Sequence, residues 1–312
     1  MTRTTDLLLT ALAPAVWGST YYVTTEWLPG VDPLTLAMLR ALPAGLLLLA
    51  LVRQLPPRRH LGRVVLLGTL NFALFWSLLF VAAQRLPGGV AATLGSSQAL
   101  LVLLLARGWL GTPLHAASVA SAVVGAVGVG LLVLAPSAAL DPLGLAAGFG
   151  SAAAMAAGTV LSRKWQWGAA PLTFTAWQLA AGGFVLLPLA MLMEPALPAL
   201  KPAHVGGLLY LGLVGAAVTY FLWFRGIARL GPGPVSLLAL LSPIVAVGIG
   251  WALLDQSLTP VQIFGALVVL VSVAAGQSAP LQQQAAAAPR PRLEPGRPAG
   301  RPTLGAHRGT VL

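Results

Sequence analysis

Cysteine is absent from the 312-residue sequence, and charged residues make up only 8% of it. Without cysteine the chain has no disulfide framework, no thiolate metal ligand and no thiol nucleophile. About a quarter of the residues in an ordinary soluble domain are charged, so this scarcity of charge excludes that class. A disordered chain is poor in apolar residues, whereas 57% of this sequence is hydrophobic. The two observations together predict an all-α polytopic membrane protein.

Side-chain sets that carry enzyme or metal chemistry are also missing. The seven acidic residues and four histidines form no HExxH metal motif and no pair of carboxylates within an apolar run, and no Walker lysine is present. We therefore expect no enzyme activity, no catalytic residue, no metal and no cofactor. The net charge of +11 is spread between apolar runs and over the C-terminal end. We expect the lipid bilayer as a partner, and no nucleic acid.

Ten apolar runs are each long enough to cross a hydrocarbon core of about 30 Å as a helix, which takes about 20 residues. They are apolar on all sides, unlike the alternating strands of a membrane β-barrel, so helices are expected. The first run is longer than a signal-peptide core, and we expect it to remain as the first span. The expected spans are 7–25, 33–52, 64–84, 89–106, 116–134, 143–162, 171–193, 205–224, 234–254 and 260–279.

Basic residues between the spans fall mainly on one side. Ten arginines and lysines, counted before the C-terminal end, lie on the side of Arg3, whereas the opposite side holds only Arg85 and Lys201. Five of the seven acidic residues also lie on that opposite side. The positive-inside rule then predicts that both termini are cytoplasmic.

Two stretches of the sequence repeat one pattern. PLTLAMLRALPAG begins at Pro33 and PLTFTAWQLAAGG at Pro171, and the junction RLPGG at Arg85 is matched by RLGPG at Arg229. With five spans in each half, the second half must enter the membrane from the opposite face, which predicts inverted repeats. The expected parts are a cytoplasmic N-terminus 1–6, a first repeat 7–134, a second repeat 143–279 and a disordered Pro/Arg-rich cytoplasmic tail 280–312.

Several segments together resemble one known family. They are WGSTYYVTT at 17–25, PLTxxxxRxxxAG at 33–45, RLPGGVAA from Arg85, the Ser-Pro pair at Ser242, and GALVVLVSVAAG ending at Gly276. The sequence is similar to EamA-domain proteins of the drug/metabolite transporter (DMT) superfamily, and within it to the PecM-like, amino-acid-metabolite-type exporters. The resemblance covers about residues 7–279. It implies a ten-helix bundle with a central cavity that exports small metabolites across a bacterial inner membrane.

The sequence departs from the family pattern at three places. The family often ends its fourth and ninth helices in Gly-Glu, whereas here Thr112 follows Gly111 and Gln256 follows Asp255. Its first-half Ser-Pro pair is Ser97-Gln98 in this chain. No role of that glutamate or of the first proline is therefore carried over.

Polar and aromatic side chains within the expected spans are candidates for a substrate cavity, because polar groups are costly inside a membrane. Arg40 is either a counter-charge for a substrate carboxylate or a packing residue bonded to backbone carbonyls. Packing is favoured, because the second copy has Gln178 at this position. For the other candidates the alternatives are helix packing and interfacial anchoring. The candidates are Trp17, Ser19, Tyr22, Arg40, Asn71, Phe75, Trp76, Ser97, Gln98, Thr159, Trp177, Gln178, Tyr220, Trp223 and Ser242.

The expected function is efflux of an amino-acid-like or drug-like small molecule by alternating access. Proton-driven carriers usually carry an acid or a histidine within the bundle, and the expected interior has neither. We therefore expect facilitated export, with proton coupling through Glu26 or Asp255 as the weaker alternative. The rival function is a regulatory or scaffolding membrane protein that acts through the Arg-rich tail. The sequence leaves open whether the chain is a monomer or a homodimer.

Overall fold

The computed structural model describes residues 2–86, 88–133, 141–195, 197 and 199–287, and over this part of the chain the regular elements are all helices. The helices of the first half are α1 (Arg3–Gly18), α2 (Thr20–Tyr22), η1 (Val23–Trp27), α3 (Pro33–Val52), η2 (Arg58–His60), α4 (Leu61–Gly68), η3 (Thr69–Leu74), α5 (Phe75–Arg85), α6 (Gly88–Ser96), α7 (Gln98–Leu110) and α8 (Ala116–Val133). Those of the second half are α9 (Pro142–Lys164), α10 (Pro171–Met193), α11 (Pro202–Leu209), η4 (Tyr210–Val218), α12 (Thr219–Leu230), α13 (Pro232–Leu238), α14 (Leu241–Leu253) and α15 (Pro260–Ala287).

Nine helices of the described part are long and apolar enough to cross a membrane, and they coincide with nine of the ten expected spans. The chain is therefore a multi-pass membrane protein. The first expected span, 7–25, is helical but interrupted at Ser19, and α1 already begins at Arg3, ahead of the expected start. The count of ten crossings stays a prediction.

Four spans depart from a plain α-helix, at matching places in the two halves. The third and eighth spans each contain a π-helical segment, η3 and η4. The fourth span breaks at Ser97 between α6 and α7, and the ninth breaks at 239–240 between α13 and α14. Such interruptions leave backbone groups outside the regular helix ladder, and in transporters they are found beside binding sites.

The two PLT stretches lie on α3 and α10, which pack along each other through matching positions. Gly45 of α3 lies against the backbone of Ala180, and Gly183 of α10 lies against the backbone of Leu42. Each glycine is twelve residues, and each partner nine residues, after the first proline of its own copy. A Cβ atom at either glycine would meet the backbone of the other helix. This close approach therefore requires glycine.

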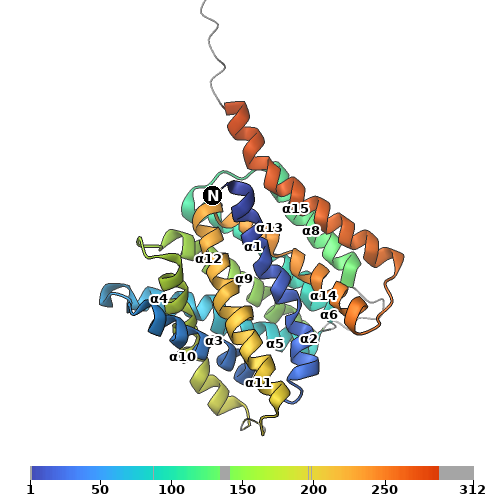
Figure 1. Ribbon diagram of the computed structural model, residues 1–312. Coiled ribbons are helices and arrows are strands. Elements are labelled where there is room, and N and C mark those ends of the chain that lie inside the picture. The colour runs from blue at the N-terminus through green and yellow to red at the C-terminus, as the bar shows by residue number, and fades with distance from the viewer. Residues whose placement is uncertain (1, 87, 134–140, 196, 198, 288–312) are drawn as a thin grey trace, which may run out of the picture.

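A second close pair, α8 and α15, lies along one flank of the molecule (Figure 1). Gly128 packs against Val269, and Gly265 packs against the backbone of Leu132. The N-terminal end of α1 contacts α15: Nη2 of Arg3 donates to the carbonyl of Gln277 at 2.9 Å. α15 continues to Ala287, into the segment 280–312 that the sequence predicts to be disordered; residues 288–312 lie outside the described part.

The N-terminus of α3 is capped by the other half of the chain. The carboxylate of Glu194, at the end of α10, accepts from the backbone N–H groups of Leu34 and Thr35, each at 2.6 Å. A carboxylate at this place satisfies donors that a helix leaves unpaired and complements the positive end of its dipole. Glu194 thus adds an anchor to the α3–α10 contact.

Candidate functional site

Five aromatic side chains from four segments meet inside the bundle. This aromatic cluster consists of Trp17 of α1, Phe72 of η3, Trp76 of α5, and Tyr220 and Trp223 of α12. The ring centroid of Trp17 lies 4.8 Å from that of Tyr220 and 5.0 Å from that of Trp223. Four of the five are candidates from the sequence, and Phe72 was missed because an apolar aromatic residue in a span looks like core.

Hydrogen bonds hold Trp17 and the residues after it against the second half of the chain. Nε1 of Trp17 donates to Oγ1 of Thr219 at 3.0 Å, and two residues further along, Oγ of Ser19 lies 2.7 Å from the hydroxyl oxygen of Tyr210. Gly18 lies against the carbonyl of Ser242. The interrupted end of α1 therefore contacts the π-helical segment η4 on one side and the break of the ninth span on the other.

Arg40 borders the aromatic cluster. Its Nη2 donates to the carbonyl of Gly215 at 2.6 Å, and its guanidinium carbon lies 5.0 Å from the centroid of Trp76. The same carbonyl accepts from Oγ1 of Thr219 at 2.8 Å. A backbone carbonyl oxygen has two lone pairs and can therefore accept both donors. The contact is the kind that the packing interpretation of Arg40 describes.

A second buried polar group lies between η3, α9 and α10. Nδ2 of Asn71 donates to Oε1 of Gln178 at 2.7 Å and to Oγ of Ser162 at 3.2 Å. Asn71, Gln178 and Thr159 are fully buried, and the amide of Asn71 lies directly against Gly158. The candidates Asn71 and Gln178 therefore form one polar cluster, to which the structure adds Ser162.

The two polar contacts occupy matching positions of the two halves. Asn71 and Gly215 each lie fourteen residues before the matched junction arginines, and Arg40 and Gln178 are matched by the PLT stretches. In one half the polar residue of the PLT helix bonds Gly215, and in the other it bonds Asn71. Each contact therefore joins a PLT helix of one half to a π-helical segment of the other.

The breaks of the fourth and ninth spans carry the remaining serine candidates. Ser97 lies at the first break, where its Oγ donates to the carbonyl of Leu94 at 2.6 Å, and Gln98, which follows it, is buried. A cavity of about 600 Å³ adjoins this break. It is lined by Thr93, Ser97, Leu100, Ala122, Val123, Ala126, Val127, Gly130, Leu131 and Val261. Among the candidates, Ser97 alone lines this apolar cavity, and the aromatic cluster is packed elsewhere.

Three further candidates make other contacts. Trp177 donates from Nε1 to the carbonyl of Gln54 at 2.7 Å, beyond the C-terminal end of α3. Tyr22 packs against a separate apolar group that includes Leu36, and Phe75 is partly buried against the core. Seven of the fifteen candidates therefore belong to the aromatic and amide clusters or border them: Trp17, Arg40, Asn71, Trp76, Gln178, Tyr220 and Trp223.

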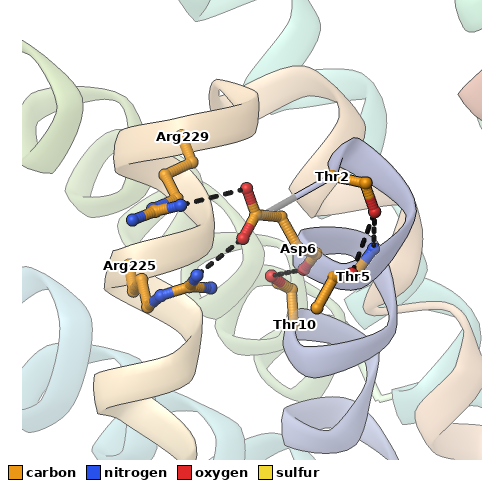
Figure 2. A network of polar contacts seen from close by, with 6 residues as sticks. All are labelled: Thr2, Thr5, Asp6, Thr10, Arg225 and Arg229. Atoms are coloured by element: carbon orange, nitrogen blue, oxygen red, sulfur yellow. Dashed lines mark hydrogen bonds and ion pairs between the residues drawn. The ribbon is translucent and has the colours of Figure 1, made fainter.

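Sequence reasoning missed a buried charged cluster near the N-terminal end of α1 (Figure 2). Oδ1 of Asp6 lies 2.6 Å from Nη2 of Arg225, and Oδ2 lies 3.5 Å from Nη1 of Arg229. Both arginines were counted as basic loop residues, whereas α12 extends to Leu230 and includes them. Asp6 was placed in an N-terminal segment, although it lies in α1 and is buried. Spacing of four residues between the arginines, on one helix face, was the available signal.

The ionisation of Asp6 is set by opposing effects. Burial removes water from the carboxylate and raises its pKa, while the hydrogen bond and charge of Arg225, and then the charge of Arg229, lower it. The net effect is a pKa below the ordinary value for aspartate. Asp6 is therefore an anion at neutral pH.

The groups gathered here are aromatic rings, amides, hydroxyls and a guanidinium, which are side-chain types that can contact a small molecule. In the described ranges no three His, Cys, Asp or Glu residues gather as a metal site would require. Interrupted helices at matching positions, with polar and aromatic groups beside them, are the arrangement of membrane carriers. The class of protein is thus a multi-pass membrane transporter.

Comparison with known proteins gives the family. The profile of the EamA-like transporter family matches residues 4–134 and 142–275, and the chain belongs to this family, as its motifs indicate. Protein PecM of Dickeya dadantii is 44% identical over 259 residues, which cover 82% of this chain and 87% of PecM. The uncharacterized inner membrane transporter YedA of Escherichia coli K12 is 28% identical, covering 83% and 86% of the two chains.

Further similarities agree with this family. A probable amino-acid metabolite efflux pump of Escherichia coli K12 is 25% identical, covering 86% of this chain and 93% of the pump. A protein crystal structure with 20% identity superposes with a TM-score of 0.76 over 91% of this chain and 99% of that chain. The structural similarity establishes the fold, and two of the relatives are named as a transporter and as an efflux pump.

Proposed function

We propose that this chain is an exporter of small metabolites in the bacterial inner membrane, working by alternating access between two inverted five-helix repeats. Ten crossings and cytoplasmic termini belong to the proposal. The names of two relatives support it: one is named as an inner membrane transporter and the other as a probable amino-acid metabolite efflux pump.

The observation that carries the proposal is the pair of matching contacts between the halves. Arg40 bonds Gly215 in η4, and Gln178 bonds Asn71 in η3. Matching contacts support two structurally related halves, and in carriers built from inverted repeats such halves exchange roles between the two access states. Alternating access requires two such conformers.

In this proposal the aromatic cluster holds the apolar part of the ligand, and the amides of Asn71 and Gln178 orient its polar part. Arg40 belongs to the scaffold, because its Nη2 is bonded to Gly215 and its matching residue is uncharged. Burial of the rings means that the ligand reaches them only after α1 or its neighbours move. Export is driven by the metabolite gradient, with proton coupling through exposed Glu26 or Asp255 as the alternative.

The experiment measures efflux from proteoliposomes loaded with radiolabelled amino acids and their derivatives. Liposomes that carry the same compounds but no protein are the control. We expect saturable efflux of at least one compound, unchanged when the pH gradient is collapsed. Loss of efflux on collapse would establish the coupled alternative. If no compound moves and none shifts the unfolding temperature, the exporter proposal fails.

A further inference from the structure

The Asp6 cluster sets one carboxylate against two guanidinium groups, so these three groups together carry one net positive charge (Figure 2). The side chains of Asp6 and Arg225 are 9% and 10% exposed, whereas that of Arg229 is 47% exposed. The two arginines are one helical turn apart on α12. They therefore form a cationic track that leads from the surface to a buried position.

The carboxylate and the arginines belong to different helices. Asp6 is on α1, where its backbone carbonyl accepts from Oγ1 of Thr10 at 2.6 Å, and both arginines are on α12. Movement of α1 away from α12 would take the anion with it and leave both cations on α12. A buried guanidinium that loses its carboxylate must gain water or another anion, because an uncompensated buried charge is costly.

This charged cluster is one end of a continuous contact between α1 and α12. One turn further along α1, Thr10 lies directly against Gly226, and further still Trp17 contacts Trp223 and Tyr220. We name this contact, from Asp6 to Trp17, the α1–α12 seam. Opening the seam from its charged end would connect the arginines to the aromatic cluster without crossing another helix of the bundle.

The helix that carries Asp6 has a feature that permits such movement. Pro14 lies inside α1 and removes a backbone hydrogen bond, and α1 ends at Gly18. The residues between Asp6 and the proline can therefore tilt while Trp17 and Ser19 keep their contacts with Thr219 and Tyr210.

We infer that Arg225 and Arg229 form an anion site in the transport path, which Asp6 occupies in this conformer and which binds the carboxylate of a transported molecule when the seam opens. Asp6 is then a tethered competitor: it closes the seam when no substrate is present and yields to a carboxylate of the same chemistry. Planar guanidinium groups favour carboxylates through paired N–H donors. The role in transport rests on the proposed function, whereas the anion site itself does not.

The binding test uses formate, which replaces the carboxylate that Asp6→Ala removes. In detergent, Asp6→Ala should unfold at a lower temperature than the wild type, and sodium formate should restore a few degrees in a saturable manner. Sodium chloride at equal concentration controls for ionic strength. The double variant Asp6→Ala/Arg225→Gln should show no formate effect, and neither should Asp255→Ala, which removes an exposed aspartate. If Asp6→Ala is recovered only as aggregate, the yield of monodisperse protein with formate or chloride present from lysis onward is compared instead.

Equal effects of formate and chloride on Asp6→Ala, in temperature or in yield, would overturn the anion site. The transport test then compares phenylalanine with phenylalaninamide, which lacks the carboxylate, in proteoliposomes of wild type and Arg225→Gln. We expect the wild type to move phenylalanine faster than phenylalaninamide, and the variant to lose at least about tenfold of this preference. An unchanged preference in the presence of formate binding would overturn the role in transport. If the wild type moves neither probe, nor any compound of the wider efflux screen, the proposed function fails while the formate result still decides the anion site.

Discussion

Nη2 of Arg40 and the carbonyl oxygen of Gly215 lie 2.6 Å apart in the interior of the bundle, and they join α3 to η4. The matching residues Gln178 and Asn71 join α10 to η3 at 2.7 Å. One contact uses a charged donor and a backbone acceptor, and the other uses two amides. The geometry of the duplicated scaffold is thus kept while its chemistry differs between the halves.

Arg40→Gln should lower stability and keep export. The substitution gives the first half the residue of the second, and it removes a charge-assisted hydrogen bond, which contributes about 1.5–3 kcal/mol. Unfolding temperature in detergent and efflux from proteoliposomes measure the two effects. Loss of efflux in a variant that folds and inserts normally would return Arg40 to the ligand-binding residues.

Gly45→Ala should destabilise the α3–α10 contact, because the added Cβ meets the backbone of Ala180. Forcing extra atoms into a packed contact costs about 1–3 kcal/mol. Gly183→Ala should act in the same way through Leu42. The matched control is Gly108→Ala in α7, where no atom lies within 4 Å of the added Cβ. If the control loses as much stability as Gly45→Ala, the close approach of the two helices is not the cause.

Asp6 should make stability depend on pH at the acidic side. Its pKa in the folded chain is lower than the unfolded value, so its contribution is fully present above the unfolded pKa of about 3.9 and is lost as pH falls through the folded pKa. Asp6→Asn should therefore unfold below the wild type at neutral pH and approach it in acid. The check is the difference in unfolding temperature between the two proteins across this range. A difference that is constant with pH would contradict the ion pairs.

The sequence predicted nine spans that the described part of the chain confirms, because long apolar runs are a local pattern. The inverted repeats stay a prediction. Pro243 explains why the ninth break was foreseeable: proline lacks the N–H that would bond the carbonyl of Ala239, one turn earlier in the chain. The fourth span breaks at Ser97 although Gln98 stands where the family has proline. No proline predicts that break.

Long-range pairings were the part of the site that the sequence could not give. Asp6 and Arg225 are 219 positions apart, and each taken alone looks like a charge at a helix end. Glu194 likewise caps a helix 160 positions away. The sequence favoured a packing role for Arg40 only because a second copy of its stretch exists for comparison. The pairings of Asp6 and of Glu194 have no such second copy, so only the folded structure reveals them.

Deleting every residue after Gln277 should leave export unchanged. The contacts that hold this end of the described chain, from Arg3 to the carbonyl of Gln277 and from Nε2 of Gln277 to the carbonyl of Pro234, remain in the shortened protein. Efflux and unfolding temperature are compared with those of the full chain. Unchanged stability with loss of efflux would favour the regulatory function of the tail over transport by the bundle alone.

Trp17→Phe should reduce export more than stability. Phenylalanine keeps a ring against Tyr220 and Trp223 but loses the Nε1 donor that bonds Thr219, so the packing of the cluster survives and the position of the ring does not. A loss of about 1.4 kcal/mol in ligand binding corresponds to about a tenfold weaker affinity. We expect an efflux KM higher by about this factor, with an unfolding temperature within a few degrees of the wild type.

The matched control for Trp17→Phe is Trp251→Phe in α14, because that tryptophan is 59% exposed on the outside of the bundle. This substitution should leave both the KM and the unfolding temperature nearly unchanged, because the ring of Trp251 lies on the outer surface of the bundle. Equal KM values for the two variants would remove Trp17 from the ligand-binding residues. A raised KM for Trp17→Phe alone would place the ligand beside the aromatic cluster, because the two substitutions differ only in where the indole is lost.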